Sequence, residues 1–179
     1  MRIITGKYKG KILKAPAAIR PTEDRVKKAF FDIVDVADAD LCELFAGSGS
    51  VGFEALSQGA RSVTFVEKDR NCVRVLEENL KGMEGGEVFT MDALDAINFL
   101  FKKGRKYDLV FLDPPYSAGL AEKALQSLEA YDILQSSGFV CVQHYKKNVL
   151  PQVCGPLEVW REARYGDTVL SFYTRTVTE

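Results

Sequence analysis

The stretch FAGSGSVGFEAL, Phe45–Leu56, decides the fold, because it joins an apolar strand to a helix through a glycine-rich turn. Its core, Gly47 to Gly52, matches the dinucleotide-binding pattern G-x-G-x-x-G. Glycines at the first two of these positions let the backbone turn tightly and approach a ligand. The stretch therefore predicts a nucleotide-binding loop. By itself it fits NAD and S-adenosylmethionine equally well, since both contain an adenosine.

Strand and helix patterns alternate after this loop. Apolar runs predict strands at 41–45, 62–67, 87–91, 107–113 and 138–144. Helical spacing predicts helices between them, at 50–58, 70–81, 93–103 and 119–131. This alternation is typical of the α/β class, in which a mostly parallel, Rossmann-like sheet is covered on both faces. Two final strands, at 157–165 and 168–176, have no helix between them, so we expect an antiparallel edge.

Residues 1–36 precede this alternation and are strongly basic. Apolar runs at 2–5 and 11–13 predict a small hairpin, and residues 20–34 have the spacing of a helix. Through Lys28 the chain carries nine Lys or Arg residues against two acids, although its overall net charge is −1. Because basic arms often contact phosphates, we expect this extension to face RNA. The side chains proposed for that contact are Arg2, Lys7, Lys9, Lys11 and Arg20.

Composition excludes several classes of protein. With 46% hydrophobic and 27% charged residues, the chain resembles an ordinary globular protein. No apolar run approaches the ~18 residues of a membrane helix, and the N-terminus lacks the apolar core of a secretory signal. We expect a cytoplasmic monomer. The four cysteines have no C-x-x-C spacing and the single histidine, His144, is expected at the surface, so no metal site is predicted.

Carboxylates at the ends of the predicted strands favour one of the two cofactors. Glu67 lies twenty residues after Gly47, where it can accept hydrogen bonds from both ribose hydroxyls. Glu43 lies beside the loop, where it would repel a pyrophosphate but attract the ammonium of S-adenosylmethionine. Asp92 can accept a hydrogen bond from the adenine amino group, with the Ala93 N–H donating to the ring, and it can also cap the next helix. These features favour S-adenosylmethionine.

The sequence Asp113-Pro-Pro-Tyr116 ends a predicted strand that should lie beside the glycine loop. Pro114 and Pro115 make a stiff corner with exposed carbonyls, because proline fixes its own φ and lacks an N–H. An amino group on a base ring is a poor nucleophile. Asp113 and the Pro114 carbonyl can each accept one of its hydrogens and orient the nitrogen toward a methyl sulfonium, while Tyr116 stacks on the base. This corner predicts direct methyl transfer to a ring-bound amine, without a metal.

The chain resembles one known family in six stretches: RIITGKYKGKIL, RPTEDRVKKAFFDIV, ELFAGSGSVGFEALSQGA, VTFVEKDRNCVRVLEENL, YDLVFLDPPY and YGDTVLSFY. These are similar to the bacterial 16S rRNA guanine-N2 methyltransferases of the RsmD family, over nearly the whole chain. The resemblance implies a class I S-adenosylmethionine-dependent methyltransferase domain over 37–179, with a seven-stranded sheet whose last strand is antiparallel. It also implies transfer to the exocyclic N2 of one guanine in the small ribosomal subunit or its assembly intermediate.

The resemblance implies functional residues as well. The target-base site would be formed by Asp113, Pro114, Pro115 and Tyr116. The cofactor site would be formed by Glu43, Phe45, Ala46, Gly47, Ser48, Gly49, Glu67, Lys68, Asp92 and Ala93. Thr22 and Arg25 belong to the family's RPT-DR segment, and we expect them to face the cofactor or the RNA near the pocket. The family often has Asp where this chain has Glu43, which keeps the charge on a longer side chain.

Other functions fit part of the pattern. The nearest alternative keeps the reaction and changes the acceptor to the N6 of adenine in DNA or RNA, or to a protein glutamine. An NAD-dependent oxidoreductase would explain the glycines and Glu67, but it leaves the Asp-Pro-Pro-Tyr corner and the basic extension without a role. A catalytically silent RNA-binding module would leave the intact corner unexplained.

Overall fold

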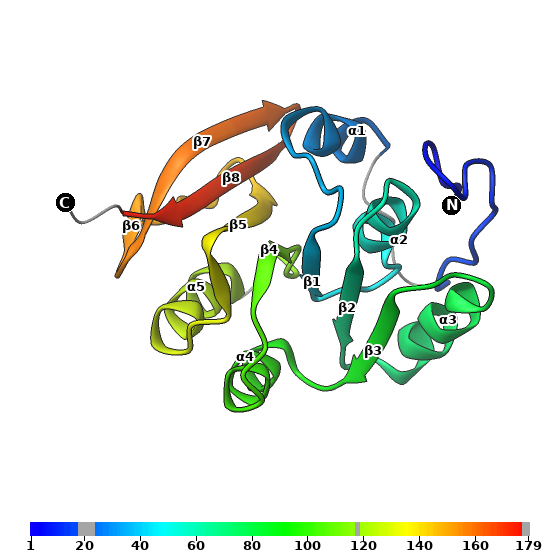
Figure 1. The fold of residues 1–179 in the computed structure, drawn as a ribbon. Coiled ribbons are helices and arrows are strands. Elements are labelled where there is room, and N and C mark those ends of the chain that lie inside the picture. Colours follow the sequence, from blue (N-terminus) through cyan, green and yellow to red (C-terminus); the bar gives the residue numbers. More distant parts are fainter. Residues whose placement is uncertain (18–23, 117–118, 177–179) are drawn as a thin grey trace.

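The computed structural model describes residues 1–17, 24–116 and 119–176 of the 179-residue chain. Within these residues, eight strands form one sheet: β1 (Asp40–Leu44), β2 (Ser62–Glu67), β3 (Gly86–Thr90), β4 (Tyr107–Leu112), β5 (Leu134–Tyr145), β6 (Val153–Cys154), β7 (Leu157–Tyr165) and β8 (Thr168–Arg175). Their order is β3-β2-β1-β4-β5-β8-β7-β6 (Figure 1). The first five strands in this order are parallel, and the remaining pairings are antiparallel.

Helices cover both faces of the sheet (Figure 1). One face carries α1 (Asp24–Ile33), α2 (Ser50–Ser57) and α3 (Arg70–Leu80), and the other carries α4 (Ala93–Lys102) and α5 (Leu120–Ala130). The sequence of β4 is apolar from Leu109 to Leu112, because helices cover both of its faces. Leu109 and Phe111 belong to the hydrophobic cluster under the first three helices, whereas Val110 and Leu112 belong to the cluster under the other two. Because side chains alternate along a strand, a doubly covered strand needs apolar residues on both faces.

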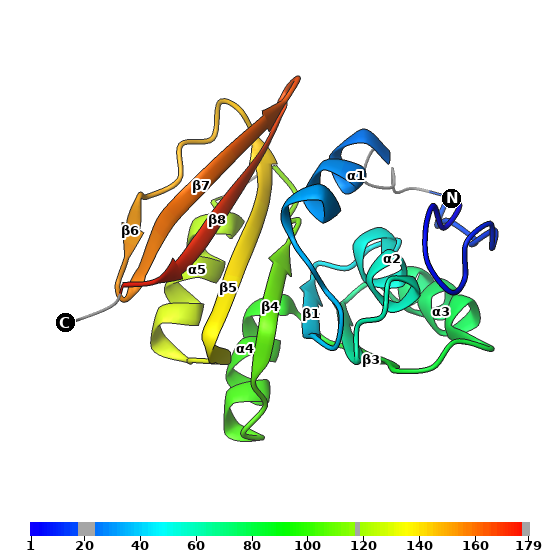
Figure 2. The ribbon, with the colours of Figure 1, turned by 45° about the horizontal axis from the view of Figure 1, so that its top comes forward.

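The strand order reverses its direction at β1. This strand pairs in parallel with β2 on one side and with β4 on the other. Figure 2 shows the arrowheads of β1 and β4 at the same end of the sheet. The chain leaves β1 toward α2 on one face and leaves β4 toward α5 on the opposite face. Diverging connections of this kind open a crevice at the carboxyl ends of the strands. The glycine loop and the Asp113–Tyr116 corner both lie there.

The predicted α/β fold is confirmed, with two local differences. The short strand β6 pairs with β7 at the sheet edge, so the sheet has eight strands instead of the seven implied by the resemblance. Strand β5 begins at Leu134, before the predicted start at 138, because residues 135–138 form an irregularity within the strand, where the register against β4 shifts between Tyr107 and Leu109. A Cβ at Gly138 would lie 2.8 Å from the Tyr107 carbonyl oxygen. The predicted N-terminal hairpin is present, with an antiparallel bridge between Arg2 and Ile12 and backbone hydrogen bonds from the Ile3 N–H to the Lys11 carbonyl (3.1 Å) and from the Leu13 N–H to the Met1 carbonyl (2.9 Å).

The N-terminal arm, residues 1–17, is held on α2 by a buried carboxylate. The Glu54 side chain is 2% exposed and accepts hydrogen bonds from the backbone N–H groups of Ile4 (2.9 Å) and Thr5 (2.7 Å), and from the Thr5 hydroxyl (2.8 Å). The ammonium of Lys27, from α1, lies 3.5 Å from the same carboxylate and is 1% exposed. Glu54 and Lys27 therefore join the arm, α1 and α2 around one buried ion pair.

Candidate active site

A cavity of about 760 Å³ opens at the carboxyl ends of β1, β2, β4 and β5. Such a volume is typical of pockets that hold a nucleotide-sized ligand. The residues that line it are Val26, Glu43, Phe45, Ala46, Gly47, Ser48, Val66, Glu67, Lys68, Met91, Asp92, Ala93, Asp113, Pro114, Pro115, Tyr116, Leu120, Gln143, Tyr145, Asp167 and Thr168. The cavity therefore contains both halves of the site predicted from the sequence.

The glycine loop forms one wall and adopts a strained backbone. Phe45 has φ 57°, a left-handed conformation that is uncommon for a bulky residue and is found mostly at functional sites. The loop is fixed by hydrogen bonds from Ala46 N–H to the Val66 carbonyl (2.9 Å) and from Gly47 N–H to the Glu67 carboxylate (2.8 Å). Gly49 has φ 70° and does not line the cavity. A Cβ there would lie 2.6 Å from the Leu76 side chain, so packing requires this glycine.

Glu43 is a buried acid at the base of the cavity. Its side chain is 3% exposed and accepts a hydrogen bond from the Gly52 N–H, at the start of α2, at 2.9 Å. Burial raises the pKa of Glu43 to about 8; the Gly52 and Val51 N–H groups oppose the rise, and the charges of Asp113 and Glu67 add to it. A nearby cation would favour the charged form, so this carboxyl is suited to meet an ammonium group.

The Glu43 pKa predicts a pH dependence of stability in the absence of ligand. Between its ordinary pKa of 4.5 and its folded value of about 8, the folded state retains a proton that the unfolded state releases. This contribution is full below pH 4.5 and is lost as the pH rises toward 8. We expect the Tm of Glu43→Gln, relative to wild type, to increase between about pH 5 and pH 8.5. A difference in Tm that is constant over that range would show that Glu43 titrates normally.

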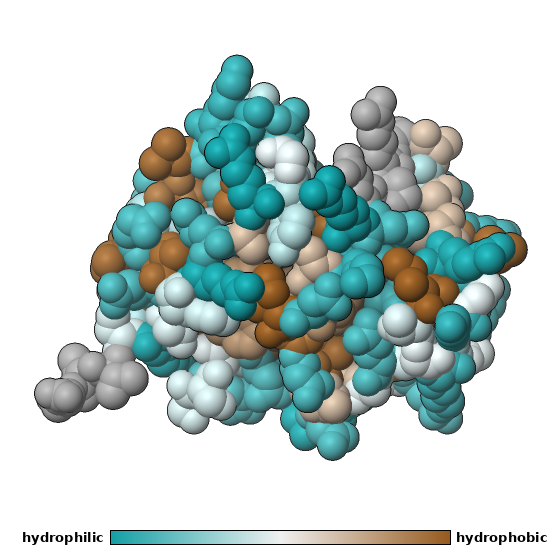
Figure 3. All heavy atoms as spheres, turned by 90° about the horizontal axis from the view of Figure 1, so that it is seen from above, coloured by the Kyte–Doolittle hydropathy of each residue, from teal (hydrophilic) through white to brown (hydrophobic). Residues whose placement is uncertain are grey.

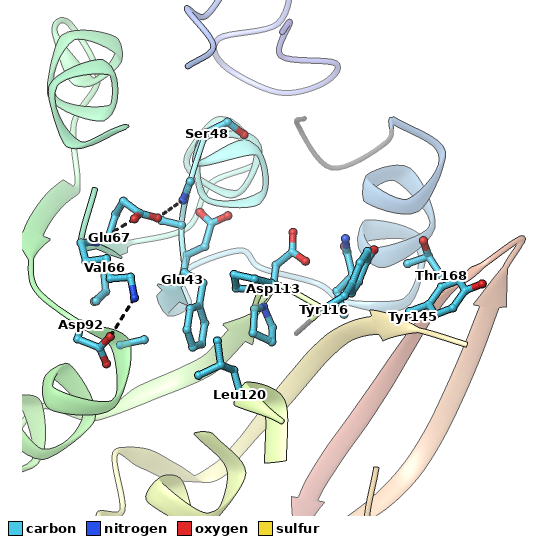
Figure 4. A pocket seen from close by; sticks show the side chains of 18 of the residues that line it. Glu43, Ser48, Val66, Glu67, Asp92, Asp113, Tyr116, Leu120, Tyr145 and Thr168 are labelled. Carbon is cyan, nitrogen blue, oxygen red and sulfur yellow. Dashed lines mark hydrogen bonds and ion pairs between the residues drawn. The ribbon is translucent and has the colours of Figure 1, made fainter. Parts of the chain in front are cut away.

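Glu67, Lys68 and Asp92 line the cavity at the carboxyl ends of β2 and β3. Figure 4 shows Glu67 and Asp92 at the same end of the cavity. One Glu67 oxygen accepts from the backbone N–H groups of Lys68 and Asp69, both at 2.8 Å, while the other accepts from Gly47. Asp92 caps α4 by accepting from the Leu94 N–H at 2.9 Å, and its carboxylate lies 3.5 Å from the Lys68 ammonium. The helix-cap interpretation of Asp92 is therefore confirmed, and Asp92 still faces the cavity.

The Asp113–Tyr116 corner forms the middle of the cavity, between the glycine loop and the aromatic end (Figure 4). Pro114 is buried, whereas Pro115 and Tyr116 are exposed, and the Tyr116 ring lies 5.9 Å from the ring of Tyr145 between centroids. In Figure 4, Glu67 and Asp92 lie at one end, Glu43 and Asp113 in the middle, and the two tyrosines at the other end. The cavity thus offers an acidic pocket next to an aromatic one.

Several cavity residues were not singled out by sequence reasoning. Met91 and Leu120 are apolar residues that resemble core positions, and Gln143 lies in an apolar strand. Asp167 and Thr168 lie where the chain passes from β7 to β8, a connection for which the sequence predicted only an antiparallel edge. Only the position of β8 beside β5 brings that turn to the cavity. A single Gln in a strand, or a single Asp in a turn, does not by itself indicate a binding site.

Other predicted residues lie elsewhere. Thr22 and Arg20 fall outside the described residues. Arg25 is exposed on α1 and does not line the cavity, whereas the next residue, Val26, does. His144, expected at the surface, is only 5% exposed, and its Nε2 lies 2.8 Å from the Ser171 hydroxyl. It is buried because β5 continues to Tyr145 and pairs with β8 over this length.

The basic side chains of the arm are largely exposed. Arg2, Lys7 and Lys9 face solvent, and Lys7 lies 3.4 Å from Glu84 in an exposed ion pair. Lys11 donates to the carbonyl oxygens of Asn79 and Lys81, at 3.3 and 3.1 Å. Exposed ion pairs of this kind contribute little to stability, so the cations remain available to other anions. Seen from above, the molecule is mostly hydrophilic, with apolar side chains in separate patches (Figure 3).

Metal-binding clusters and membrane-spanning helices are both absent from the described part of the chain. Its residues include no group of three or more His, Cys, Asp or Glu side chains arranged to hold a metal ion. Among the same residues, no helix has the length and apolar character needed to cross a membrane.

Comparisons with known proteins identify the family to which this chain belongs. The family model described as "Conserved hypothetical protein 95" matches residues 1–174. Ribosomal RNA small subunit methyltransferase D of Escherichia coli (strain K12) is 34% identical over 179 residues, covering 98% of this chain and 90% of that protein. The solved structure of a putative methyltransferase from Escherichia coli, yhhF, has a TM-score of 0.87 at 34% identity, covering 99% of each chain.

A more distant likeness concerns the fold alone. The structure of SMU.776, solved in complex with SAH, has a TM-score of 0.70 at 15% identity and covers 93% of this chain and 52% of that chain. The family match and the 34% identity confirm the resemblance found in the sequence over nearly the whole chain. The chain belongs to the Conserved hypothetical protein 95 family, which is the family of the ribosomal RNA small subunit methyltransferase D proteins.

Proposed function

We propose that this protein transfers a methyl group from S-adenosylmethionine to the exocyclic N2 amino group of one guanine in the 16S rRNA of the small ribosomal subunit. One observation carries the proposal. The glycine loop with its carboxylates and the Asp113–Tyr116 corner line the same cavity. A methyl donor and a ring-bound amine can therefore meet without either leaving its pocket. Membership of the family supports rRNA as the substrate.

The acidic end of the cavity suits the cofactor. Glu67 would accept the ribose hydroxyls, and Asp92 with Ala93 would bind the adenine edge. Glu43, buried behind the loop, would face the ammonium of the methionine part. When bound, S-adenosylmethionine supplies an electrophilic methyl group on a sulfonium. The carboxylates at this end favour a ligand with positive charge over the pyrophosphate of NAD.

The corner would orient the acceptor. The Asp113 carboxylate and the Pro114 carbonyl would each accept one hydrogen of the guanine amino group, while Tyr116 stacks on the base. Held in this way, the nitrogen presents its lone pair to the methyl carbon, and the proton leaves after transfer. The two prolines hold this geometry before the base arrives, so little orientation entropy is lost in the transition state.

The basic arm would contact the RNA backbone. The exposed Arg2, Lys7 and Lys9 lie outside the cavity, and phosphate contacts need no particular base sequence. Such contacts position the RNA, whereas the cavity selects the base. Lys11 and Arg20, the latter outside the described residues, belong to the same proposed surface.

The deciding experiment uses tritiated S-adenosylmethionine and small subunits from cells that lack this enzyme. We expect label in 16S rRNA, and digestion to nucleosides should place it in N2-methylguanosine. Label in N6-methyladenosine would support the adenine alternative. Titration calorimetry provides the matching control for the cofactor: S-adenosylhomocysteine should bind and NADH should not. Tighter binding of NADH would overturn the assignment of the cofactor.

A further inference from the structure

Gln143 is a buried polar residue to which the proposed reaction assigns no role. It lies near the end of β5 and is only 6% exposed. Its Oε1 atom is buried and has no hydrogen-bond partner among the residues that the structure describes. Buried polar atoms in proteins are nearly always paired, so an exception beside an active site points to a partner supplied by a ligand.

The position of Gln143 identifies that ligand as the target base. Leu112 of β4 is in register with Val142 of β5, so Gln143 follows at the level of Asp113. Gln143 lines the active-site cavity and also a second cavity of about 340 Å³, lined by Pro114, Tyr116 and Leu120 as well. The amide therefore lies beside the corner that would hold the guanine amino group, at the end of the cavity away from Glu67 and Asp92.

We propose that Gln143 reads the Watson–Crick edge of the target guanine, with its Oε1 accepting a hydrogen bond from guanine N1–H. This inference rests on the proposed function. Guanine N1 carries a hydrogen next to the N2 amine, whereas the N1 of adenine is an acceptor and would face the carbonyl oxygen without a hydrogen between them. The amide thus distinguishes the two bases at the atom adjacent to the one methylated. Asp113 orients the amine, and Gln143 determines which base can enter.

The test compares Gln143→Leu with Gln135→Leu. Both residues lie on β5, and Gln135 lines neither cavity. We expect Gln143→Leu to lower kcat/KM on hypomethylated small subunits about ten- to a hundredfold, the usual discrimination of a good base-edge contact. Affinity for S-adenosylhomocysteine should not change. Because the substitution removes an unpaired buried oxygen, the Tm of the free protein should stay the same or rise, which separates lost recognition from misfolding.

A second arm uses small subunits whose rRNA carries adenine in place of the modified guanine. The wild-type enzyme should prefer guanine strongly, and Gln143→Leu should reduce that preference about tenfold or more. If the wild type labels guanine and Gln143→Leu behaves like Gln135→Leu in both rate and preference, the assignment of Gln143 is wrong and the proposed function stands. If the wild type labels no guanine, the proposed function is wrong and this inference falls with it.

Discussion

Asp113→Ala is expected to lower kcat/KM for methyl transfer about a thousandfold or more, while binding of S-adenosylhomocysteine stays close to wild type. The carboxylate would accept one of the two hydrogens of the acceptor amine. Without it, the Pro114 carbonyl alone cannot fix the orientation of the nitrogen. The cofactor end of the cavity, around Glu67 and Asp92, is built from other strands and should remain intact.

Two variants make this result specific. Asp113→Asn keeps an acceptor oxygen of the same shape and loses the charge, so it should retain more activity than Asp113→Ala. Asp95→Ala is a matched control, because Asp95 is exposed on α4 and does not line the cavity. Rates are measured with tritiated cofactor and affinity by calorimetry. Turnover by Asp113→Ala at a rate near that of wild type would remove Asp113 from its role.

Glu54→Ala is expected to lower the free energy of unfolding by about 3–5 kcal/mol, as breaking a buried ion pair usually does. For a chain of this size, that corresponds to a fall in Tm of about 6–20 °C. The substitution removes the acceptor for two backbone N–H groups and the Thr5 hydroxyl, and it leaves the Lys27 ammonium buried without this carboxylate. The N-terminal arm should detach before the rest of the protein unfolds.

Limited trypsin digestion tests that detachment directly. Cleavage after Lys7, Lys9 or Lys11, identified by mass spectrometry, should be faster in Glu54→Ala than in wild type. Glu77→Ala is the matched control, because Glu77 is exposed on α3, and surface changes of this kind stay within about 0.5 kcal/mol. Equal Tm values for the two variants, with equal cleavage rates, would mean that Glu54 does not hold the arm.

Much of the fold could be predicted from local patterns. The strands and helices from residue 41 onward lie close to their predicted positions, because doubly buried strands and amphipathic helices leave a period in the sequence. The predicted start of β5 was wrong, because a polar stretch that contains glycine does not end the strand. Residues 135–138 form an irregularity in β5, where the register against β4 shifts between Tyr107 and Leu109, and such a stretch has no strand period in the sequence. The N-terminal hairpin was predicted correctly, because backbone hydrogen bonds from Ile3 to Lys11 and from Leu13 to Met1 flank the Arg2–Ile12 bridge.

The properties of the site also fall into those that the sequence predicts and those that depend on tertiary structure. The sequence alone was sufficient to identify the glycine loop, Glu67, Asp92 and the Asp113–Tyr116 corner, since each follows a strand and such ends meet at one edge of a parallel sheet. Tertiary structure alone decided that Glu43 is buried against Gly52 and that Glu54 anchors the arm. It also decided that Gln143 lies at the level of Asp113 and that its buried oxygen has no partner among the described residues. These properties depend on contacts between segments far apart in the chain. No spacing within a segment encodes such contacts, because burial and pairing are set by which neighbours the fold brings together.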